Sequence, residues 1–428
     1  MKKNEIAEGF LGNMSYFCIV KRNICLFKSF FVCLMTLLTH VGSVSAQQSL
    51  SAVNNSSLDS IDISLLTCQP HDEVYSLYGH TSIRVQDFRN GTDIAVNFGV
   101  FDSSADYFVW RFVFGQTDYM MAVYDFSRFI EEYRHYGSGV YQQCINMDRE
   151  EKRVFLQALY ENSRPENVVY RYNFLYNNCT TKARDIILES INGNVVYEST
   201  WLQKDDLSIR DLLHFKTKDY PWERVGVDLL VGVKADDLAS HSERQFLPEV
   251  LMNDFDSATV VRPDGSRKAL VDSAMWVLLP GTPYHAEGGW WCPLKPRQMA
   301  VLFFCAILSL CLYELLLLKR ILLWVDYCVV LIYGLAGVIL GAMLFSAHPT
   351  VNQNFQIFLL NPLYLFITLP VLHIKWRWHF MLIMLLLFFA GNAIQSYADG
   401  MNIMALALLL IVSNNMYLGR SANGLRKK

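Results

Sequence analysis

The chain has 428 residues, which is enough for two domains. Its 37 Lys and Arg residues against 40 Asp and Glu residues give a net charge of −3. This near-neutral balance, without a basic stripe interleaved with aromatic residues, argues against a nucleic-acid partner. Hydrophobic residues make up 52% of the chain and are spread unevenly along it. That content is too high for an ordinary soluble protein.

The first residues predict an export signal. Lys21, Arg22 and Lys28 precede the apolar run SFFVCLMTLLTHVG, which ends in the small residues of SVSA. A basic region, a short apolar core and small residues one and three positions before the break are typical of a cleaved signal peptide. We therefore expect a signal peptide over residues 1–46 and an exported domain over residues 47–298.

The exported part predicts both strands and helices. HTSIRVQD and GTDIAVNFGVF alternate apolar and polar residues around the turn pair Asn90-Gly91, which indicates an antiparallel hairpin. DREEKRVFLQALYENSRP has helical apolar spacing, an acidic first turn and a Pro near its end. VVYRYNFLY is a strand or an extended segment that leads into a helix beginning at Cys179. Residues 201–255 are expected to be mostly helical.

A second hairpin is predicted in ATVVRPDGSRKALVDS, with its turn at residues 263–265. Strands and helices are therefore mixed along the exported part without a regular βαβ alternation. The predicted class is an α+β domain.

Five apolar runs follow the exported part, and each has about the twenty residues that a bilayer requires. They cover residues 299–318, 321–345, 355–373, 379–397 and 401–417. With the exported domain outside, every basic connection between the runs falls inside, as the positive-inside rule expects. We therefore predict an all-α bundle of five transmembrane helices over residues 299–428, with the C-terminus in the cytoplasm. The protein is expected to be multi-pass in the inner (cytoplasmic) membrane, with residues 47–298 on the periplasmic side.

Four of the ten cysteines lie in the exported part, namely Cys68, Cys144, Cys179 and Cys292. An oxidising compartment favours disulfides, so a disulfide or a buried thiol is one interpretation of Cys179. The other is a nucleophile. A thiol in the first turn of a helix faces unpaired N–H groups and the positive end of the helix dipole, and both favour the thiolate.

A nucleophilic Cys179 requires a base and a group that orients that base. His80 begins an alternating strand directly after Gly79, where a strand can hold an imidazole rigidly. Asn97, on the paired strand, points toward His80 if the register follows the Asn90-Gly91 turn. Each residue alone has an ordinary structural interpretation. Together they predict a Cys-His-Asn site.

Several blocks resemble one family. SLYGHTSIRV, VNFGVFD, YNFLYNNCTTKARD and a multi-span tail that holds HPTVNQNFQIFLLNPL resemble the Lnb-type lipoprotein N-acyltransferases of Bacteroides-like bacteria. The exported part is similar to the permuted papain-like group, in which the histidine strand precedes the cysteine helix. Lecithin:retinol acyltransferase and the phospholipid-dependent N-acyltransferases share that order. The resemblance implies Cys179 as the nucleophile, His80 as the base and Asn97 as the orienting residue, with Asp102 as an alternative to Asn97.

The resemblance also implies a reaction. An acyl chain would move from a phospholipid through a Cys179 thioester to the N-terminal amine of a diacylglyceryl lipoprotein, without a cofactor or a metal ion. Phospholipid and lipoprotein are then the expected partners. Two other interpretations stay open. One is an exported Cys-His hydrolase, either a phospholipase or a peptidoglycan peptidase. The other is a non-catalytic, membrane-anchored sensor or scaffold in which Cys179 forms a disulfide.

Candidate substrate-binding residues lie at two places. Tyr78, Asn178, Thr180 and Arg184 flank the expected catalytic residues. In the tail, SAHPTVNQNFQIFLLNPL places Asn354 and Asn361 near the outer end of the second and third predicted spans. One interpretation is a solvated loop with a local turn at Asn361-Pro362. The other is contact with the phospholipid, since polar side chains at membrane depth are costly unless they face protein, water or ligand.

Overall fold

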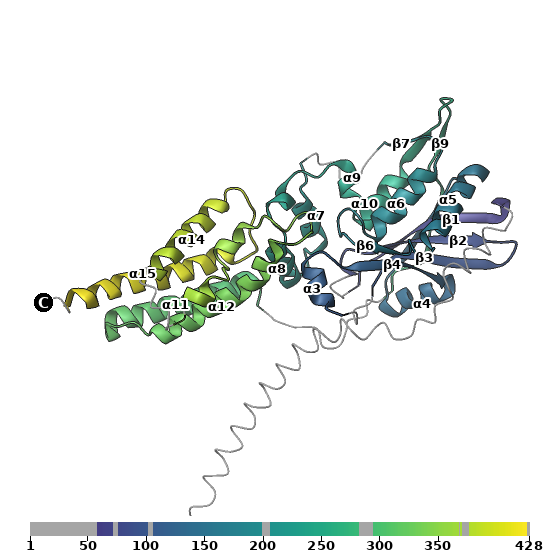
Figure 1. Cartoon of the computed structure of the whole chain (residues 1–428). Helices are drawn as coiled ribbons and strands as arrows, with labels where there is room; N and C mark the ends of the chain where they lie inside the picture. Colours follow the sequence, from purple (N-terminus) through teal and green to yellow (C-terminus); the bar gives the residue numbers. More distant parts are fainter. Residues whose placement is uncertain are drawn as a thin grey trace, which may run out of the picture.

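The computed structural model of the chain describes residues 58–71, 76–101, 106–198, 206–281, 294–367, 369 and 376–425. The expected signal peptide, Asp102 and Cys292 lie outside these residues. Within them, a region of strands and helices is followed from residue 294 by helices alone, which extend away from the sheet (Figure 1).

A seven-stranded antiparallel sheet forms the centre of the described N-terminal domain. Its strand order is β10-β5-β1-β2-β3-β4-β6. The strands are β1 (Ile61–Cys68), β2 (His80–Asp87), β3 (Thr92–Val100), β4 (Asp118–Asp125), β5 (Val140–Ile145), β6 (Val169–Arg171) and β10 (Val271–Leu278). The β2–β3 hairpin confirms the strand pair that alternation predicted around Asn90-Gly91. Gly91 has φ 69°, the left-handed conformation that such a turn requires.

Helices cover both faces of the sheet (Figure 1). One face carries α5 (Arg149–Asn162), α6 (Cys179–Ser190) and α10 (Pro248–Asp256), and the other carries α4 (Phe126–Tyr136). In the larger core, Ile63 and Ile83 of the sheet belong to one buried cluster with Phe155, Ile187 and Phe255 of the three helices. α5 begins with a capping box at Asp148, in agreement with its predicted acidic first turn.

Shorter elements complete the described domain. A three-stranded sheet is formed by β7 (Asn194–Tyr197), β8 (Ala258–Val261) and β9 (Arg267–Ala269). The pairing of β8 with β9 confirms the second predicted hairpin. The helical stretch predicted within 201–255 contains α7 (Ile209–Lys216), α8 (Pro221–Leu230), η3 (Val233–Asp236) and α9 (His241–Arg244), followed by α10. The remaining two elements are η1 (Leu58–Ser60) and α3 (Phe108–Val113).

The C-terminal bundle contains helices of unequal length. They are α11 (Pro296–Leu312), its π-helical continuation η4 (Tyr313–Leu318), α12 (Leu323–Met343), η5 (Phe355–Phe358), α13 (Tyr364–Ile367), α14 (Arg377–Gly391) and α15 (Met401–Leu425). Among the described residues, three helices are long and apolar enough to cross a membrane, namely Pro296–Leu318, Leu323–Met343 and Met401–Leu418. These match the first, second and fifth predicted runs. α14 is apolar but shorter.

The third predicted run, 355–373, does not form one helix in the residues that are described. It contains the two short helices η5 and α13 with a turn between them. At this turn Asn361 Oδ1 accepts a hydrogen bond from the N–H of Leu363 at 3.0 Å, and Pro362 has no N–H to donate. The turn packs closely on α12, where a Cβ on Gly337 would lie 2.5 Å from the Leu360 carbonyl oxygen. A hydropathy plot averages over such a turn and therefore does not detect it.

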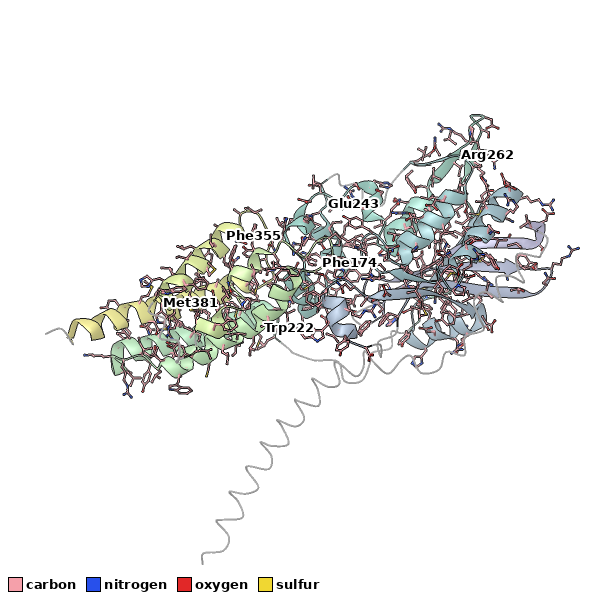
Figure 2. The ribbon with its side chains drawn as sticks, viewed as in Figure 1. Phe174, Trp222, Glu243, Arg262, Phe355 and Met381 are labelled. Atoms are coloured by element: carbon pink, nitrogen blue, oxygen red, sulfur yellow. The ribbon has the colours of Figure 1, made fainter. Side chains whose placement is uncertain are left out.

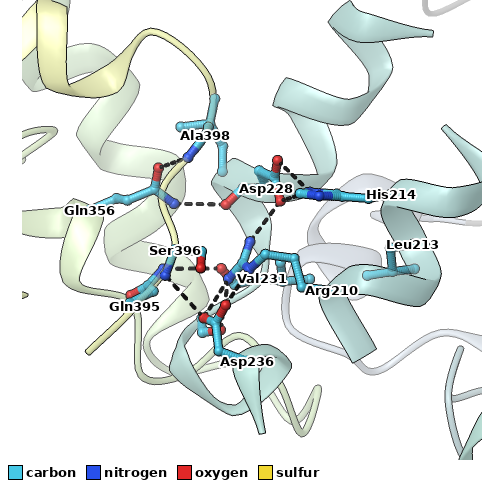
Figure 3. Close-up of polar contacts among 12 residues, drawn as sticks. Arg210, Leu213, His214, Asp228, Val231, Asp236, Gln356, Gln395, Ser396 and Ala398 are labelled. Atoms are coloured by element: carbon cyan, nitrogen blue, oxygen red, sulfur yellow. Dashed lines mark hydrogen bonds and ion pairs between the residues drawn. The ribbon is translucent and has the colours of Figure 1, made fainter. Parts of the chain in front are cut away.

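A buried polar junction joins the bundle to the N-terminal domain (Figure 3). Arg210 of α7, whose side chain is 3% exposed, donates to Asp228 at 2.7 Å and to Asp236 at 2.8 Å. His214 Nε2 lies 2.8 Å from the same Asp228 carboxylate. From the bundle, Gln356 Nε2 donates to the Asp228 carbonyl oxygen at 2.7 Å. The bundle is thus bonded directly to the helices that lie between it and the sheet.

Candidate active site

Cys179 is the first residue of α6, as the sequence predicted. Asn178 caps the helix, and its Oδ1 accepts from the N–H groups of Thr180 and Thr181, each at 2.9 Å. Thr181 Oγ1 in turn accepts from the Asn178 N–H at 2.9 Å, which completes a capping box. Because the cap uses the N–H groups of Thr180 and Thr181, it leaves the Cys179 N–H for an oxyanion.

His80 and Asn97 meet on one face of the β2–β3 hairpin. The register pairs Ser82 with Asn97, so His80, two residues before Ser82, lies diagonally across from Asn97. The Nε2–H of His80 donates to Asn97 Oδ1 at 3.2 Å. This bond leaves Nδ1 for the thiol. Gly79 has φ 80°, and a Cβ there would lie 2.8 Å from the Cys68 carbonyl oxygen, so glycine is required directly before His80.

The charges at the site favour a thiolate. Burial by itself raises the pKa of Cys179, but the positive charge of His80 and the His80 hydrogen bond lower it, together with bonds from the Thr81 N–H and the Thr180 hydroxyl. The net pKa of Cys179 is lowered to about 7. Burial by itself lowers the pKa of His80. The Cys179 charge and the bonds to Cys179 and Asn97 outweigh burial, so the pKa of His80 is raised. The pair therefore favours thiolate and imidazolium together.

The reactivity of Cys179 toward an aromatic disulfide reagent is expected to rise as the pH passes through about 7, since the thiolate is the reacting form. His80→Ala removes the charge and the hydrogen bond of His80, the two largest contributions that lower the pKa of Cys179, and keeps burial. The midpoint should therefore move upward by about two units. At pH 7 the thiolate fraction then falls about 50-fold, while higher intrinsic nucleophilicity returns about eightfold, for a net loss of about sixfold.

Stopped-flow labelling between pH 5 and 10 measures this midpoint. Cys144→Ala is the matched control, because Cys144 is the other partly exposed thiol in the described part of the N-terminal domain. An unchanged midpoint in His80→Ala would show that His80 does not set the pKa of Cys179.

The four flanking candidates for substrate binding have different surroundings in the structure. Asn178 and Thr180 are 6% and 0% exposed. Asn178 is the helix cap, and Thr180 Oγ1 bonds Thr81 Oγ1 at 3.1 Å, so both shape the start of α6. Arg184 pairs with Asp185 and donates to the Ser242 carbonyl oxygen. The buried Tyr78 hydroxyl has no hydrogen-bond partner among the described residues.

Asn354 of the tail lies in the polar junction, and Asn361 lies in the turn between η5 and α13. Asn354 is 5% exposed and donates to the Leu229 carbonyl oxygen at 2.8 Å, while its Oδ1 accepts from the Gln356 N–H at 3.0 Å. Asn361 is also buried, and it makes the local turn described above. Contact of these two amides with a phospholipid stays a prediction. In the structure Asn354 bonds the N-terminal domain, and Asn361 bonds residues of the bundle itself.

Sequence analysis missed an aromatic wall beside Cys179. Gly99 lies next to Cys179, and a Cβ on Gly99 would lie 3.7 Å from the Cys179 Cβ. Beyond it the rings of Phe101 and Tyr119 stack at 4.9 Å, and those of Tyr119 and Tyr172 stack at 4.0 Å. Burial first, and then neighbouring charges that include that of Cys179, raise the pKa of Tyr172. The alternating tyrosines of VVYRYN are the sequence signal for this wall.

The cysteines of the described N-terminal domain are free thiols. Cys68, Cys144 and Cys179 form no disulfide with one another. Cys68 is buried on β1 opposite His80, close to the site. Two of the three disulfide partners considered for Cys179 are therefore unbonded to it, and the third, Cys292, lies outside the described residues.

Comparison with known families gives two matches. The model of the Lnb N-terminal periplasmic domain matches residues 50–213, and that of the Lnb transmembrane domain matches residues 287–422. The search of curated proteins and the search of solved structures found no match. The first matched stretch holds His80, Asn97 and Cys179, and the second holds the helices of the bundle.

Proposed function

The chain belongs to the Lnb family, with a periplasmic N-terminal domain and a multi-span transmembrane domain, and from this premise we propose that it is a thiol-dependent N-acyltransferase of the inner membrane. Its donor is a phospholipid and its acceptor is the N-terminal amine of a diacylglyceryl lipoprotein. We assign residues 1–46 to a signal peptide, 47–298 to the catalytic domain and 299–428 to five membrane-spanning segments. The histidine strand before the cysteine helix supports a permuted papain-like arrangement.

In the first half-reaction the Cys179 thiolate attacks the carbonyl carbon of a phospholipid ester. A C–S bond forms and the carbonyl oxygen becomes an oxyanion, which the Cys179 N–H and the positive end of α6 stabilise. The C–O bond to the glycerol then breaks. The His80 imidazolium gives its proton to the departing alkoxide, which leaves a lysophospholipid and an acyl-thioester.

In the second half-reaction the lipoprotein amine attacks the thioester carbonyl carbon. His80, now neutral, accepts a proton from the amine, so a C–N bond forms as the C–S bond breaks. The thiolate and the imidazolium are both restored. Asn97 holds the imidazole ring through the Nε2–H bond during both half-reactions, since a free ring would lose the orientation toward Sγ.

One observation carries this proposal. A free thiol whose pKa is lowered to about 7 stands at a helix start, beside a histidine that an asparagine orients. Two lipid-anchored substrates also explain why such a site belongs to a membrane domain, because both would diffuse in the outer leaflet. A hydrolase of the cell wall has no such requirement.

The covalent intermediate tests the proposal. Purified protein in phospholipid vesicles, without an acceptor, is expected to carry one acyl group on Cys179 that hydroxylamine removes. Adding a diacylglyceryl-cysteine peptide should discharge the adduct and produce an amide of matching mass. Intact-protein and peptide mass spectrometry measure both steps, with Cys144→Ala as the control that keeps the adduct.

Release of the acyl chain as free fatty acid in the presence of the peptide would instead identify a phospholipase. Turnover without an adduct, even after rapid quenching, would contradict a thioester intermediate.

A further inference from the structure

The short helix α3 presents an exposed apolar face. The face consists of Tyr107, Val109, Trp110 and Phe112, which are 79%, 36%, 56% and 42% exposed. Four large apolar side chains within six consecutive residues form a patch that a water-facing surface does not favour. Trp and Tyr are the residues enriched where a membrane meets water.

α3 lies beside the segment that follows α12, the second of the long apolar helices. After α12 ends at Met343, the chain bonds back to α3, with the Ala347 N–H donating to the Phe114 carbonyl oxygen at 3.0 Å. His348 Nε2 lies 3.1 Å from the Phe112 carbonyl oxygen. Figure 1 shows α3 at the end of the sheet that faces the bundle. Figure 2 labels Phe174, whose ring lies 6.2 Å from that of His348. The apolar face thus adjoins the end of a helix that is long and apolar enough to cross a membrane.

A pocket opens between α3 and the sheet. Phe101, Phe108 and Tyr119 form its apolar wall, and Arg111, Thr117 and Asp118 form its polar end. Its volume is about 160 Å³, which suits an apolar group about the size of benzene and therefore the first carbons of an acyl chain. The whole chain would not fit and would have to extend into the leaflet.

The polar end of this pocket suits an anionic ester. Arg111 and Arg171 both bind Asp118, at 2.5 Å and 2.8 Å, so two positive groups share one negative group. Asp118 neutralises only one of these two guanidinium groups. The remaining positive charge can bind a phosphate, which guanidinium groups recognise well. Thr117 is 2% exposed, lines the pocket, and its Oγ1 has no hydrogen-bond partner among the described residues. A buried hydroxyl without a partner is costly, and an ester oxygen would supply one.

The pocket lies beside the segment that contacts the reactive thiol. Its wall residue Phe101 follows Gly99 by two positions, and a Cβ on Gly99 would lie 3.7 Å from the Cys179 Cβ. Tyr119 stacks on Tyr172 at 4.0 Å, within the aromatic wall of the active site. An ester carbonyl at the inner end of the pocket would therefore approach the sulfur.

We propose that α3 inserts its apolar face into the outer leaflet, and that the pocket beneath it binds the glycerol and proximal acyl carbons of one phospholipid. The phosphate lies at Arg111 and Arg171, and Thr117 donates to an ester oxygen. This site rests on the proposed acyltransferase function, to which it adds the place where the donor lipid enters.

A photocrosslinking experiment tests the site without catalysis. Full-length Cys179→Ala protein is reconstituted in vesicles of phosphatidylethanolamine and phosphatidylglycerol that carry a diazirine near the ester of one chain. After irradiation, peptide mass spectrometry should place adducts in 100–120, with more than half lost in Arg111→Gln. Crosslinks confined to the bundle would overturn the site.

A kinetic experiment tests the apolar face in the active protein. Trp110→Ser should raise the vesicle lipid concentration for half-maximal Cys179 acylation about tenfold, since its indole loses burial in lipid. Phe88→Ser is the matched control, because Phe88 is 63% exposed at the β2–β3 turn, at the opposite end of β2 from His80. Equal effects of both variants would contradict membrane insertion. Unchanged disulfide-reagent labelling of Cys179 shows that each variant is folded.

The outcomes separate this site from the proposed function. Adducts on the α3 region together with absent thioester formation in the wild type would support the lipid site and contradict acyl transfer. Thioester formation from vesicle lipid with adducts elsewhere would support acyl transfer and contradict this site.

Discussion

Cys179→Ala and His80→Ala are each expected to abolish lipoprotein N-acylation, with losses of about 10⁴- to 10⁶-fold, and the double variant is expected to lose no more than the worse single variant. The nucleophile and its base act as one unit, so removing either leaves nothing for the other to assist. Mass spectrometry of acceptor peptides at high enzyme concentration measures the residual rate. Thermal unfolding should stay close to that of the wild type, because neither side chain carries a large share of the core.

Cys144→Ala is the control for this experiment, since Cys144 is a free thiol on β5, two strands away from His80 on β2. Asn97→Ala should lose less activity than His80→Ala, because Asn97 positions the ring and exchanges no proton. N-acylation at the wild-type rate by purified Cys179→Ala would refute the mechanism outright. Additive losses in the double variant would show that Cys179 and His80 act independently.

Two parts of the candidate site, the His80–Asn97 pair and the start of the Cys179 helix, were predictable because local rules fix them. The Asn90-Gly91 turn fixes the β2–β3 register, and the register fixes the face on which His80 and Asn97 meet. The position of Cys179 follows from a helix-capping pattern, with Asn178 before it and Thr181 three residues after Asn178. These signals lie within twenty residues of one another in each case, whereas the approach of Cys179 to His80 depends on the packing of α6 against β2.

The partners of the polar residues in the C-terminal tail were less predictable, because tertiary contacts determine them. Asn354 is polar in an apolar tail, which is compatible with water, lipid or protein as its partner. Only the packing of α8 against η5 shows that the partner is the Leu229 carbonyl oxygen. The aromatic wall has the same origin, since Tyr119 of β4 and Tyr172 after β6 meet through strand pairing across about fifty residues of chain. Hydropathy and periodicity carry no information about such contacts.

The polar junction has a mechanical role in the proposed function. A site that takes a lipid from the outer leaflet must be held at a fixed height above it, and bonds between α7, α8 and η5 hold the domain on the bundle. Arg210 holds α8 and η3 together through Asp228 and Asp236. The same two residues bond the bundle, through the Asp228 carbonyl oxygen to Gln356 and the Asp236 carboxylate to the Ser396 N–H. Apolar contacts alone would allow sliding, whereas these bonds fix a direction as well as a distance. The junction is therefore the place where a mutation far from Cys179 should still affect the use of membrane lipid.

Arg210→Met is expected to lower the free energy of unfolding by about 3–5 kcal/mol, because it leaves the buried Asp228 and its neighbour Asp236 without their guanidinium. Differential scanning fluorimetry in detergent and limited proteolysis between the domain and the bundle measure the loss. Arg164→Met is the matched control, since Arg164 and its partner Glu161 are 45% and 40% exposed and an exposed pair of this kind contributes little to stability.

Adding Asp228→Asn to Arg210→Met should restore part of the stability, since it removes the uncompensated buried charge while the amide can still bond His214. The same double variant should recover acylation of Cys179 by vesicle lipid more than the single variant does, if the junction acts by holding the domain in place. A stability loss in Arg210→Met no larger than that in Arg164→Met would mean that water reaches Asp228. The junction would then be a hydrated contact that does not fix the height of the active site above the membrane.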